Sequence, residues 1–485
     1  MPTAARSTLT WLAAVWLSAT ASAQQVTRIS VNALGQQADG QSWYNSISHD
    51  GRFVGFHSEA TNLVPADTNG ADDAFVYDRI TAQPLRVSID SAGNQANGHS
   101  QRVQVSGDGR FVAFQSAASN LVPDDTNGNW DIFVHDRTTG QTSRVSVDSA
   151  GTQANGPSKR PAISYDGRYV AFFSWADNLV PDDTNGATEV FLHDRLTGQT
   201  TRLSIDSNGN QANGHSMYPA ISADGRYVAF ASLASNLVPD DTNDLQDIFV
   251  HDRTTGQTVR ASVSSTGQQA NDTSWYSTLT ADGHLVAFNS YASNLVPDDT
   301  NTTADVFVHD LTTGQTIRAS LSSTGQQANG SSGWPRISPD GRFLAFNSYA
   351  TNLTPGDTNG YADIFVRDLQ QLRTTRISIA FNAQQANNDS LVPAISSGGR
   401  FVAFYSVASN LVPADTNGLR DEFLCDRRGD LDADADVDDA DLSLFAQAMS
   451  GPDTATTNPD ADLDADGDCD LSDFAIFAAN FTGPR

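Results

Sequence analysis

A unit of 58 residues repeats along this chain, and its periodicity limits the fold more than any other feature of the sequence. The turn Asp-Gly of the segment SxDGRxVAF places its glycine at residues 51, 109, 167, 225, 283 and 341, and Gly399 continues the series without an insertion. Such strict spacing means that every copy makes the same turn and meets the same neighbours. Most of the 485 residues are therefore expected to form one repeat array.

Each copy contains short segments with the composition and alternation of β-strands. The segment 110–116 alternates and is rich in Val and Phe, as in a half-buried strand, and no helical period occurs in the unit. Asp-Gly and Thr-Gly pairs supply the turns. In the second copy we predict four strands, at 103–106, 110–116, 131–137 and 142–148.

Four antiparallel strands in each of seven copies predict an all-β fold, a seven-bladed β-propeller. The two ends of the array are complementary, because the chain begins with an isolated fourth strand at 27–31 and the seventh copy stops after its third strand at 423–427. We expect the N-terminal strand to complete blade seven. This arrangement would close the ring and remove its open edges.

Two segments of the sixth copy, ISPDGRFLAF at 337–346 and DIFVRD at 363–368, resemble the WD40-like repeat (PD40) of TolB-type propellers. The resemblance extends over residues 27–427, since the motif occurs in every copy. It implies a propeller in an exported protein with a binding role. The NLVPxDTNG loop is longer than the loop typical of TolB, so the partners of TolB are not carried over.

The first residues have the pattern of an export signal. Arg6 is the only charge in the first 23 residues, an apolar run follows at 9–21, and Ala21-Ser22-Ala23 matches a signal-peptidase site. An uncleaved anchor is the alternative. We predict a signal peptide at 1–23, a propeller at 24–427 and a C-terminal module at 428–485. The mature protein is expected to have no membrane span and to be periplasmic, cell-surface or extracellular.

Acidic residues outnumber basic ones 57 to 28, for a net charge of −29, and Lys159 is the only lysine. This balance excludes a general nucleic-acid binder and disfavours docking on anionic lipid. Aspartate greatly exceeds glutamate, which favours turns and oxygen-rich cation sites. Two cysteines, Cys425 and Cys469, are too few for a disulfide framework. We expect a monomer.

Residues that are the same in every copy are explained by blade architecture. The aspartate of the DGR turn is expected to accept local hydrogen bonds, and its glycine to allow a positive φ. The aspartates of the HD pairs are predicted to pair with backbone or arginine, and the preceding histidines to pack at the surface or between blades: Asp136, Asp194, Asp252, Asp310, His135, His193, His251 and His309.

Two positions of the repeat vary strongly and predict a recognition surface at the mouth of the channel. One is a pair placed just before the first predicted strand, and the other follows the second strand. Aromatic rings beside basic residues supply contact area and polar edges for a glycan or peptide ligand. The alternative is that the rings pack between loops. The predicted ligand-binding residues are Trp43, Tyr44, Lys159, Arg160, Trp175, Tyr218, Trp275, Tyr276, Tyr291, Trp334 and Tyr349.

Every long loop of the repeat carries Asp-x-Asn followed by a later carboxylate, as in Asp125, Asn127 and Asp131. Oxygen donors in this order suit calcium, whereas Asx-turn hydrogen bonding explains the same residues without a metal.

The composition changes at Gly429, where two loops place carboxylates at positions 1, 3, 5, 7, 9 and 12, the spacing of EF-hand calcium ligands. An apolar segment follows each loop, at 442–449 and 474–481. We predict that this small α-helical module binds calcium (Ca²⁺). The predicted ligands are Asp430, Asp432, Asp434, Asp436, Asp438 and Asp441 in the first loop, and Asp462, Asp464, Asp466, Asp468, Asp470 and Asp473 in the second.

The segments GDLDADADVDDADLSLF and ADLDADGDCDLSDFAIF resemble the duplicated loop–helix of a type I dockerin, over residues 429–483. The resemblance implies attachment to a cohesin-like or cell-envelope protein. Loop positions 10 and 11 are Asp439-Ala440 and Leu471-Ser472, not the Ser/Thr pairs common in cohesin readers, and Ala435 replaces the glycine at position 6.

The sequence contains no G-x-S-x-G or H-E-x-x-H motif of a hydrolase. We therefore expect a secreted, non-enzymatic, calcium-binding platform tethered through its tail. The alternatives are a carbohydrate-active hydrolase or lyase with its site at the channel mouth, in polysaccharide catabolism, and a structural envelope protein. A glycosidase would need two carboxylates across the channel, and Glu59 is the only glutamate at a variable position of the face that surrounds the channel mouth.

Overall fold

The computed structural model describes residues 25–427 and, nearer the C-terminus, residues 444–446, 448, 463, 469, 473, 474 and 477. The chain divides into two compact units, and residues 24–428 belong to the one that holds every described strand. The predicted signal peptide lies outside the described residues. No helix among the described residues is long and apolar enough to cross a membrane.

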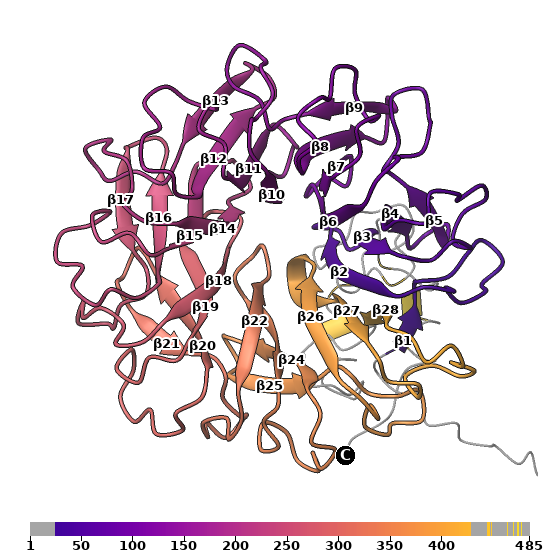
Figure 1. Cartoon of the computed structure of the whole chain (residues 1–485). Coiled ribbons are helices and arrows are strands. Elements are labelled where there is room, and N and C mark those ends of the chain that lie inside the picture. The colour runs from indigo at the N-terminus through magenta and orange to yellow at the C-terminus, as the bar shows by residue number, and fades with distance from the viewer. Residues whose placement is uncertain are drawn as a thin grey trace, which may run out of the picture. The chain divides into compact units, whose positions relative to one another are not determined.

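Seven four-stranded antiparallel sheets form the blades of a propeller, as predicted, and Figure 1 shows them arranged in a ring. The first strands of blades 1 to 7 are β2 (Ser42–Ile47), β6 (Ser100–Val105), β10 (Ser158–Ile163), β14 (Ser216–Ile221), β18 (Ser274–Leu279), β22 (Ser332–Ile337) and β26 (Ser390–Ile395). The second strands are β3 (Phe53–Ser58), β7 (Phe111–Ser116), β11 (Tyr169–Ser174), β15 (Tyr227–Ser232), β19 (Leu285–Ser290), β23 (Phe343–Ser348) and β27 (Phe401–Ser406). The third strands are β4 (Asp73–Asp78), β8 (Asp131–Asp136), β12 (Glu189–Asp194), β16 (Asp247–Asp252), β20 (Asp305–Asp310), β24 (Asp363–Asp368) and β28 (Asp421–Asp426). The fourth strands are β5 (Gln83–Arg86), β9 (Gln141–Arg144), β13 (Gln199–Arg202), β17 (Gln257–Arg260), β21 (Thr316–Arg318), β25 (Arg373–Arg376) and, in blade 7, β1 (Gln25–Arg28). A single 3₁₀ turn, η1 (Ser397–Gly399), replaces the Asp-Gly turn of blade 7.

The N-terminal strand closes the ring as predicted. Strand β1 pairs antiparallel with β28, with Gln25 opposite Asp426 and Arg28 opposite Phe423. The fourth strands are shorter than the sequence predicted, because a serine side chain takes the place of the next backbone hydrogen bond between the third and fourth strands. In blade 2, Ser146 Oγ accepts a hydrogen bond from the backbone N–H of Ile132 at 3.1 Å and donates to Asp131 at 2.5 Å.

The hydrophobic core lies within and between neighbouring blades. In blade 2 the rings of Phe114 and Phe133 stack with centroids 6.0 Å apart, and Ile132 and Val134 pack against Val170 of blade 3. The DGR turn fits into this packing through its glycine. Gly109 has a φ of 73°, and a Cβ there would overlap the ring of Phe53 in the preceding blade.

The repeated polar residues hold the blades together, as the sequence indicated. Arg110 and Asp136 form an ion pair of 2.7 Å, and this hydrogen-bonded guanidinium holds the pKa of Asp136 well below its usual range. His135 Nδ1 lies 2.9 Å from Thr142 Oγ1, which donates to the Ile89 carbonyl of the preceding blade at 2.6 Å. The histidine is therefore an interblade packing residue.

Candidate functional site: the central cavity

The innermost strand of every blade carries a β-bulge at the variable pair. In β6, Gln101 pairs with Gln115 and Gln104 pairs with Ala113, so the register shifts between them. The prediction that these pairs precede the first strand is therefore wrong, because the bulge interrupts the alternation on which strand limits were read. The second residue of each pair has a positive φ, between 51° and 57°: Tyr44, Arg102, Arg160, Tyr218, Tyr276, Trp334 and Val392.

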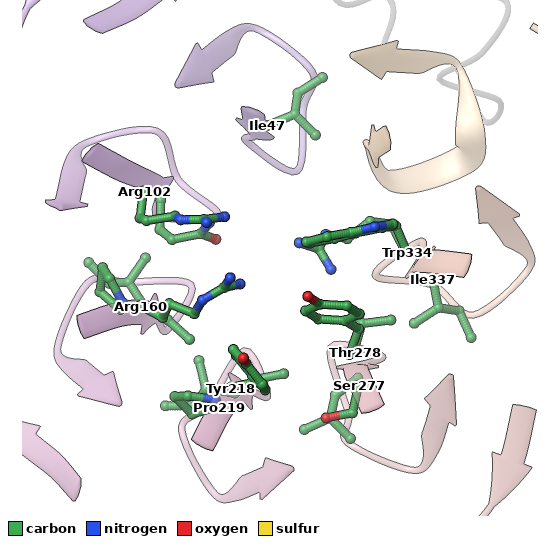
Figure 2. A pocket seen from close by; sticks show the side chains of 18 of the residues that line it. Ile47, Arg102, Arg160, Tyr218, Pro219, Ser277, Thr278, Trp334 and Ile337 are labelled. Carbon is green, nitrogen blue, oxygen red and sulfur yellow. The ribbon is translucent and has the colours of Figure 1, made fainter. Parts of the chain in front are cut away.

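A positive φ is unfavourable for residues with bulky side chains, and strain of this kind gathers at binding and catalytic sites. Here the strained residues line a cavity of about 240 Å³ at the centre of the propeller. Figure 2 shows Arg102 and Arg160 pointing into the opening, with Trp334 on the opposite side. The repeated bulge thus directs the variable side chains of all seven blades to one place.

Three arginines gather in this cavity: Arg102, Arg160 and Arg336. None forms an ion pair with a described carboxylate, and no described residue that lines the cavity is Asp or Glu. Desolvation by burial, with the nearby charges of Arg160 and Arg102, lowers the pKa of Arg336 to about 10. Burial and the charge of Arg160 likewise lower the pKa of Arg102. A strongly acidic protein therefore encloses a positively charged cavity.

Aromatic rings support the arginines and form the rest of the wall. The guanidinium carbon of Arg102 lies 3.3 Å from the centroid of Tyr44, and that of Arg160 lies 4.5 Å from Tyr218. Tyr276 and Trp334 stack with centroids 3.9 Å apart and 21° between their planes. The cavity can therefore hold an anion and offer flat apolar faces beside it.

A second cavity of about 270 Å³, which we call the groove, lies between blades 5, 6 and 7 and shares Tyr276 and Trp334 with the first. Trp275, Tyr291 and Tyr349 also line it. Their rings are partly exposed, with exposed fractions of 41% for Tyr291 and 46% for Tyr349. The two variable positions of the repeat therefore meet here, as the sequence predicted.

The other predicted ligand-binding residues lie outside both cavities. Trp43 stacks on His57 with centroids 5.4 Å apart and also lies near Arg420. Lys159 Nζ lies 5.7 Å from the centroid of the exposed Trp175 ring. These residues do not line the arginine-rich cavity.

Sequence reasoning missed Arg102 and Arg336 as binding candidates. Arg102 belongs to the variable pair, but it stands beside Gln101 rather than beside an aromatic residue. Arg336 occupies a place where the other copies have Ser, Gln, Ala or Thr. A single arginine in such a series is the signal that could have identified it.

The long loops place an arginine between their carboxylates. In blade 2, Arg144 Nη1 lies 3.2 Å from Asp125 and 3.7 Å from Asp131, and Asn127 donates to Asp131 at 2.9 Å. Within the described ranges, no group of three or more His, Cys, Asp or Glu residues could hold a metal ion. The hydrogen-bonding explanation of these loops therefore accounts for their geometry.

Of the twelve predicted calcium ligands in the C-terminal module, only Asp473 lies within the described residues. Its carboxylate is buried, and Oδ1 accepts a hydrogen bond from the backbone N–H of Leu463 at 2.5 Å. Position 12 of the second loop thus contacts position 2. Phe445 packs on Phe477, with centroids 4.9 Å apart, so the two predicted apolar segments meet.

No family model matches the chain, and no curated protein matches it. Among solved structures, the oligogalacturonate lyase of Vibrio parahaemolyticus is 13% identical, with a TM-score of 0.51 over 83% of this chain and 93% of that one. An oligogalacturonate lyase in complex with manganese is also 13% identical, with a TM-score of 0.51 over 84% and 94% of the two chains. TolB from Acinetobacter baumannii is 17% identical, with a TM-score of 0.37 over 70% and 63%. At this identity the lyases share the propeller fold with the chain.

Proposed function

We propose that this protein is a secreted, non-enzymatic binding platform whose central cavity holds an anionic ligand. Its C-terminal module binds Ca²⁺ and tethers the propeller to a cohesin-like or cell-envelope protein of a cell-surface or extracellular assembly. Of these statements, the geometry gives most support to the binding of an anion in the central cavity.

The observation that carries the proposal is the group of three arginines, Arg102, Arg160 and Arg336, without a carboxylate among the described lining residues. Like charges in a partly desolvated site repel one another unless an anion offsets them. Guanidinium groups bind carboxylate and phosphate oxygens through paired hydrogen bonds. Every fourth-strand arginine that binds its loop has acidic partners, as Arg144 does, whereas the three cavity arginines form no ion pair with a described carboxylate.

The calcium-binding loop–helix arrangement of the tail is supported by the contacts of Asp473 and Phe445. In an EF-hand-like loop the carboxylate at position 12 closes the loop on its own beginning. Asp473 lies against Leu463 in this way, and the packing of Phe445 on Phe477 would join the two loop–helix units.

The test is calorimetric titration of the full-length mature protein with D-glucuronate and with neutral D-glucose. We expect glucuronate alone to bind, and its affinity to fall at least 10-fold in Arg160→Gln and at high salt. Arg110→Gln is the matched control, because it removes one positive charge from a surface ion pair outside the cavity. Equal binding of the two sugars, or an equal effect of both variants, would contradict the proposal.

A second candidate function is a lyase for acidic polysaccharides, and the phenols beside the arginines favour it. In a β-elimination, a base removes the proton next to the carboxylate that the arginines neutralise, the bond to the leaving sugar breaks, and that sugar takes up a proton. The Tyr276 phenol, whose pKa burial raises, and the Tyr218 ring lie beside Arg160. A glycoside hydrolase would need two carboxylates, and Glu59 does not line the cavity. Incubation with acidic polysaccharides, followed by the ultraviolet absorbance of an unsaturated sugar, separates the lyase from the platform.

A further inference from the structure

The groove exists because blade 6 lacks a side chain that blade 5 has. Trp275 and Gly333 occupy the same place in their first strands, where Trp275 pairs with Asn289 and Gly333 pairs with Asn347. A Cβ on Gly333 would meet only Asn289, at 3.9 Å. The space that an indole fills in blade 5 is therefore open in blade 6.

The missing indole leaves an asparagine without its partner. In blade 5 the Asn289 amide, in the orientation that satisfies both groups, donates to the Trp275 carbonyl and accepts from Trp275 Nε1, each at 3.0 Å. Asn347 in blade 6 is 5% exposed, and its Oδ1 has no hydrogen-bond partner among the described residues. A buried acceptor of this kind costs stability unless a donor reaches it. Asn347 Oδ1 therefore marks a place for a hydroxyl or amide of a ligand.

The groove continues the arginine-rich cavity. Tyr276 and Trp334 line both, and their stacked rings form the boundary between them. The two volumes, about 240 Å³ and about 270 Å³, each fall below the roughly 300 Å³ at which ligand pockets usually begin. One ligand that spans both would fill a pocket of ordinary size.

We infer that the ligand is an acidic oligosaccharide, with its charged sugar held by Arg102, Arg160 and Arg336 and its neutral sugars lying along the groove. This inference rests on the proposed function and names its ligand class. The charged group belongs in the cavity because the described residues that line the groove carry no charge.

The groove offers what neutral sugar rings require. Tyr291 and Tyr349 present partly exposed aromatic faces, against which the C–H faces of a pyranose pack. Asn347 Oδ1 can accept a hydrogen bond from a sugar hydroxyl in the groove. Ser277 Oγ is buried in the cavity with no hydrogen-bond partner in the part of the chain that the structure describes, and it can bond to a second hydroxyl. The backbone N–H and C=O groups of a peptide could also bond to these atoms. An acidic peptide is therefore the alternative ligand in the test.

The experiment compares ligand length on the full-length mature protein by calorimetry. The probes are D-glucuronate, aldotetraouronic acid (a methylglucuronic acid carried on three xyloses), a hyaluronan tetrasaccharide and the peptide Asp-Ala-Ala-Ala. We expect at least one tetrasaccharide to bind 10-fold or more tightly than glucuronate, and the peptide to show no such gain.

The diagnostic variant is Gly333→Trp, which fills the groove with the residue that blades 1 and 5 carry at this place. It should remove the extra affinity of the tetrasaccharides and leave the affinity for glucuronate unchanged. Arg160→Gln should instead weaken the binding of the tetrasaccharides and of glucuronate. The double variant Tyr291→Ala and Tyr349→Ala should reduce the gain if Gly333→Trp misfolds. A gain that survives in these variants, no gain for either tetrasaccharide, or a gain for the peptide alone overturns the inference and leaves the anion site standing. Failure of every acid to bind overturns both.

Discussion

Arg28 and Asp421, 393 positions apart in the chain, form an ion pair of 3.4 Å where the propeller ring closes. The same Arg28 Nη1 lies 3.1 Å from Asp415, so an N-terminal residue repeats the contact that Arg144 makes within blade 2. Ser30 Oγ donates to Asp421 at 2.6 Å. The seam therefore has the same chemistry as the six blades built from continuous chain.

Deletion of residues 24–32 should destabilise the propeller severely. It removes β1 and Arg28, exposes the edge of β28, and leaves the carboxylates of Asp415 and Asp421 without their cation. Removing one partner of a buried pair alone costs about 3–5 kcal/mol. Differential scanning calorimetry should show a much lower Tm, with aggregation.

Arg86→Gln is the control for this deletion, because it breaks the equivalent ion pair inside blade 1 while the ring stays closed. The deletion should cost considerably more than the substitution. An unchanged Tm after the deletion would contradict closure by the N-terminal strand.

Glu422 should make the stability of the propeller fall as pH rises. It lies in β28, where the other blades have Ala, Val or Ile, and its buried carboxyl accepts a hydrogen bond from Asn45 Nδ2 at 3.0 Å. Burial raises its pKa from the usual 4.5 to about 8. The folded protein therefore keeps a proton that the unfolded chain releases between these values, so the free energy of unfolding decreases through this window and levels off above it.

Glu422→Gln should remove this dependence and be more stable than wild type by roughly 2–4 kcal/mol at pH 8, since one pKa unit corresponds to about 1.4 kcal/mol. Near pH 4.5 the two proteins should differ little. Urea denaturation at both pH values measures the difference in the free energy of unfolding between the two proteins. Parallel pH profiles of the two proteins would count against a buried protonated Glu422.

The repeat predicted the blades and the seam because each DGR turn obeys a local rule. Gly109 must adopt a positive φ against Phe53, and any insertion would break the contact. The limits of the first strand were not predictable, because the bulge at Arg102 leaves no trace in the hydrophobic alternation. The arginines of the loops were missed for another reason. Arg144 lies in the fourth strand, and only the fold brings it to Asp125.

Comparison among the copies identified five of the residues that line the cavity. Tyr44, Arg160 and Trp334 stood out as aromatic or basic residues at a position that varies. The groove depends instead on a side chain that is absent, at Gly333, and on the unsatisfied Asn347 behind it. Such a feature becomes visible only when the neighbouring strand is placed beside it.

The loop arginines predict that calcium will not stabilise the propeller unit. The guanidinium of Arg144 already neutralises Asp125 and Asp131, so a divalent cation would have to displace it. For a protein ending at residue 428, the Tm should be the same in millimolar calcium and in chelator. Arg144→Gln should lower the Tm in both. A calcium-dependent rise of the wild-type Tm would instead assign cations to these loops.

The C-terminal module should fold only with calcium. Its two loops carry twelve carboxylates at their ligand positions, and gathering six of them in one loop costs several kcal/mol of repulsion unless a divalent ion offsets it. The two short apolar segments at 442–449 and 474–481 are too small to offset that cost alone. Residues 429–485, titrated with calcium, should gain helix by circular dichroism and bind two ions by calorimetry. Asp473→Ala should abolish the second site, because it removes the closing carboxylate and its bond to the Leu463 N–H, while the loop at 430–441 still titrates. Asp473→Asn separates the two roles, since its amide oxygen keeps that bond but loses the charge. Equal helix content in chelator, or no binding at millimolar calcium, would refute the EF-hand interpretation of the tail.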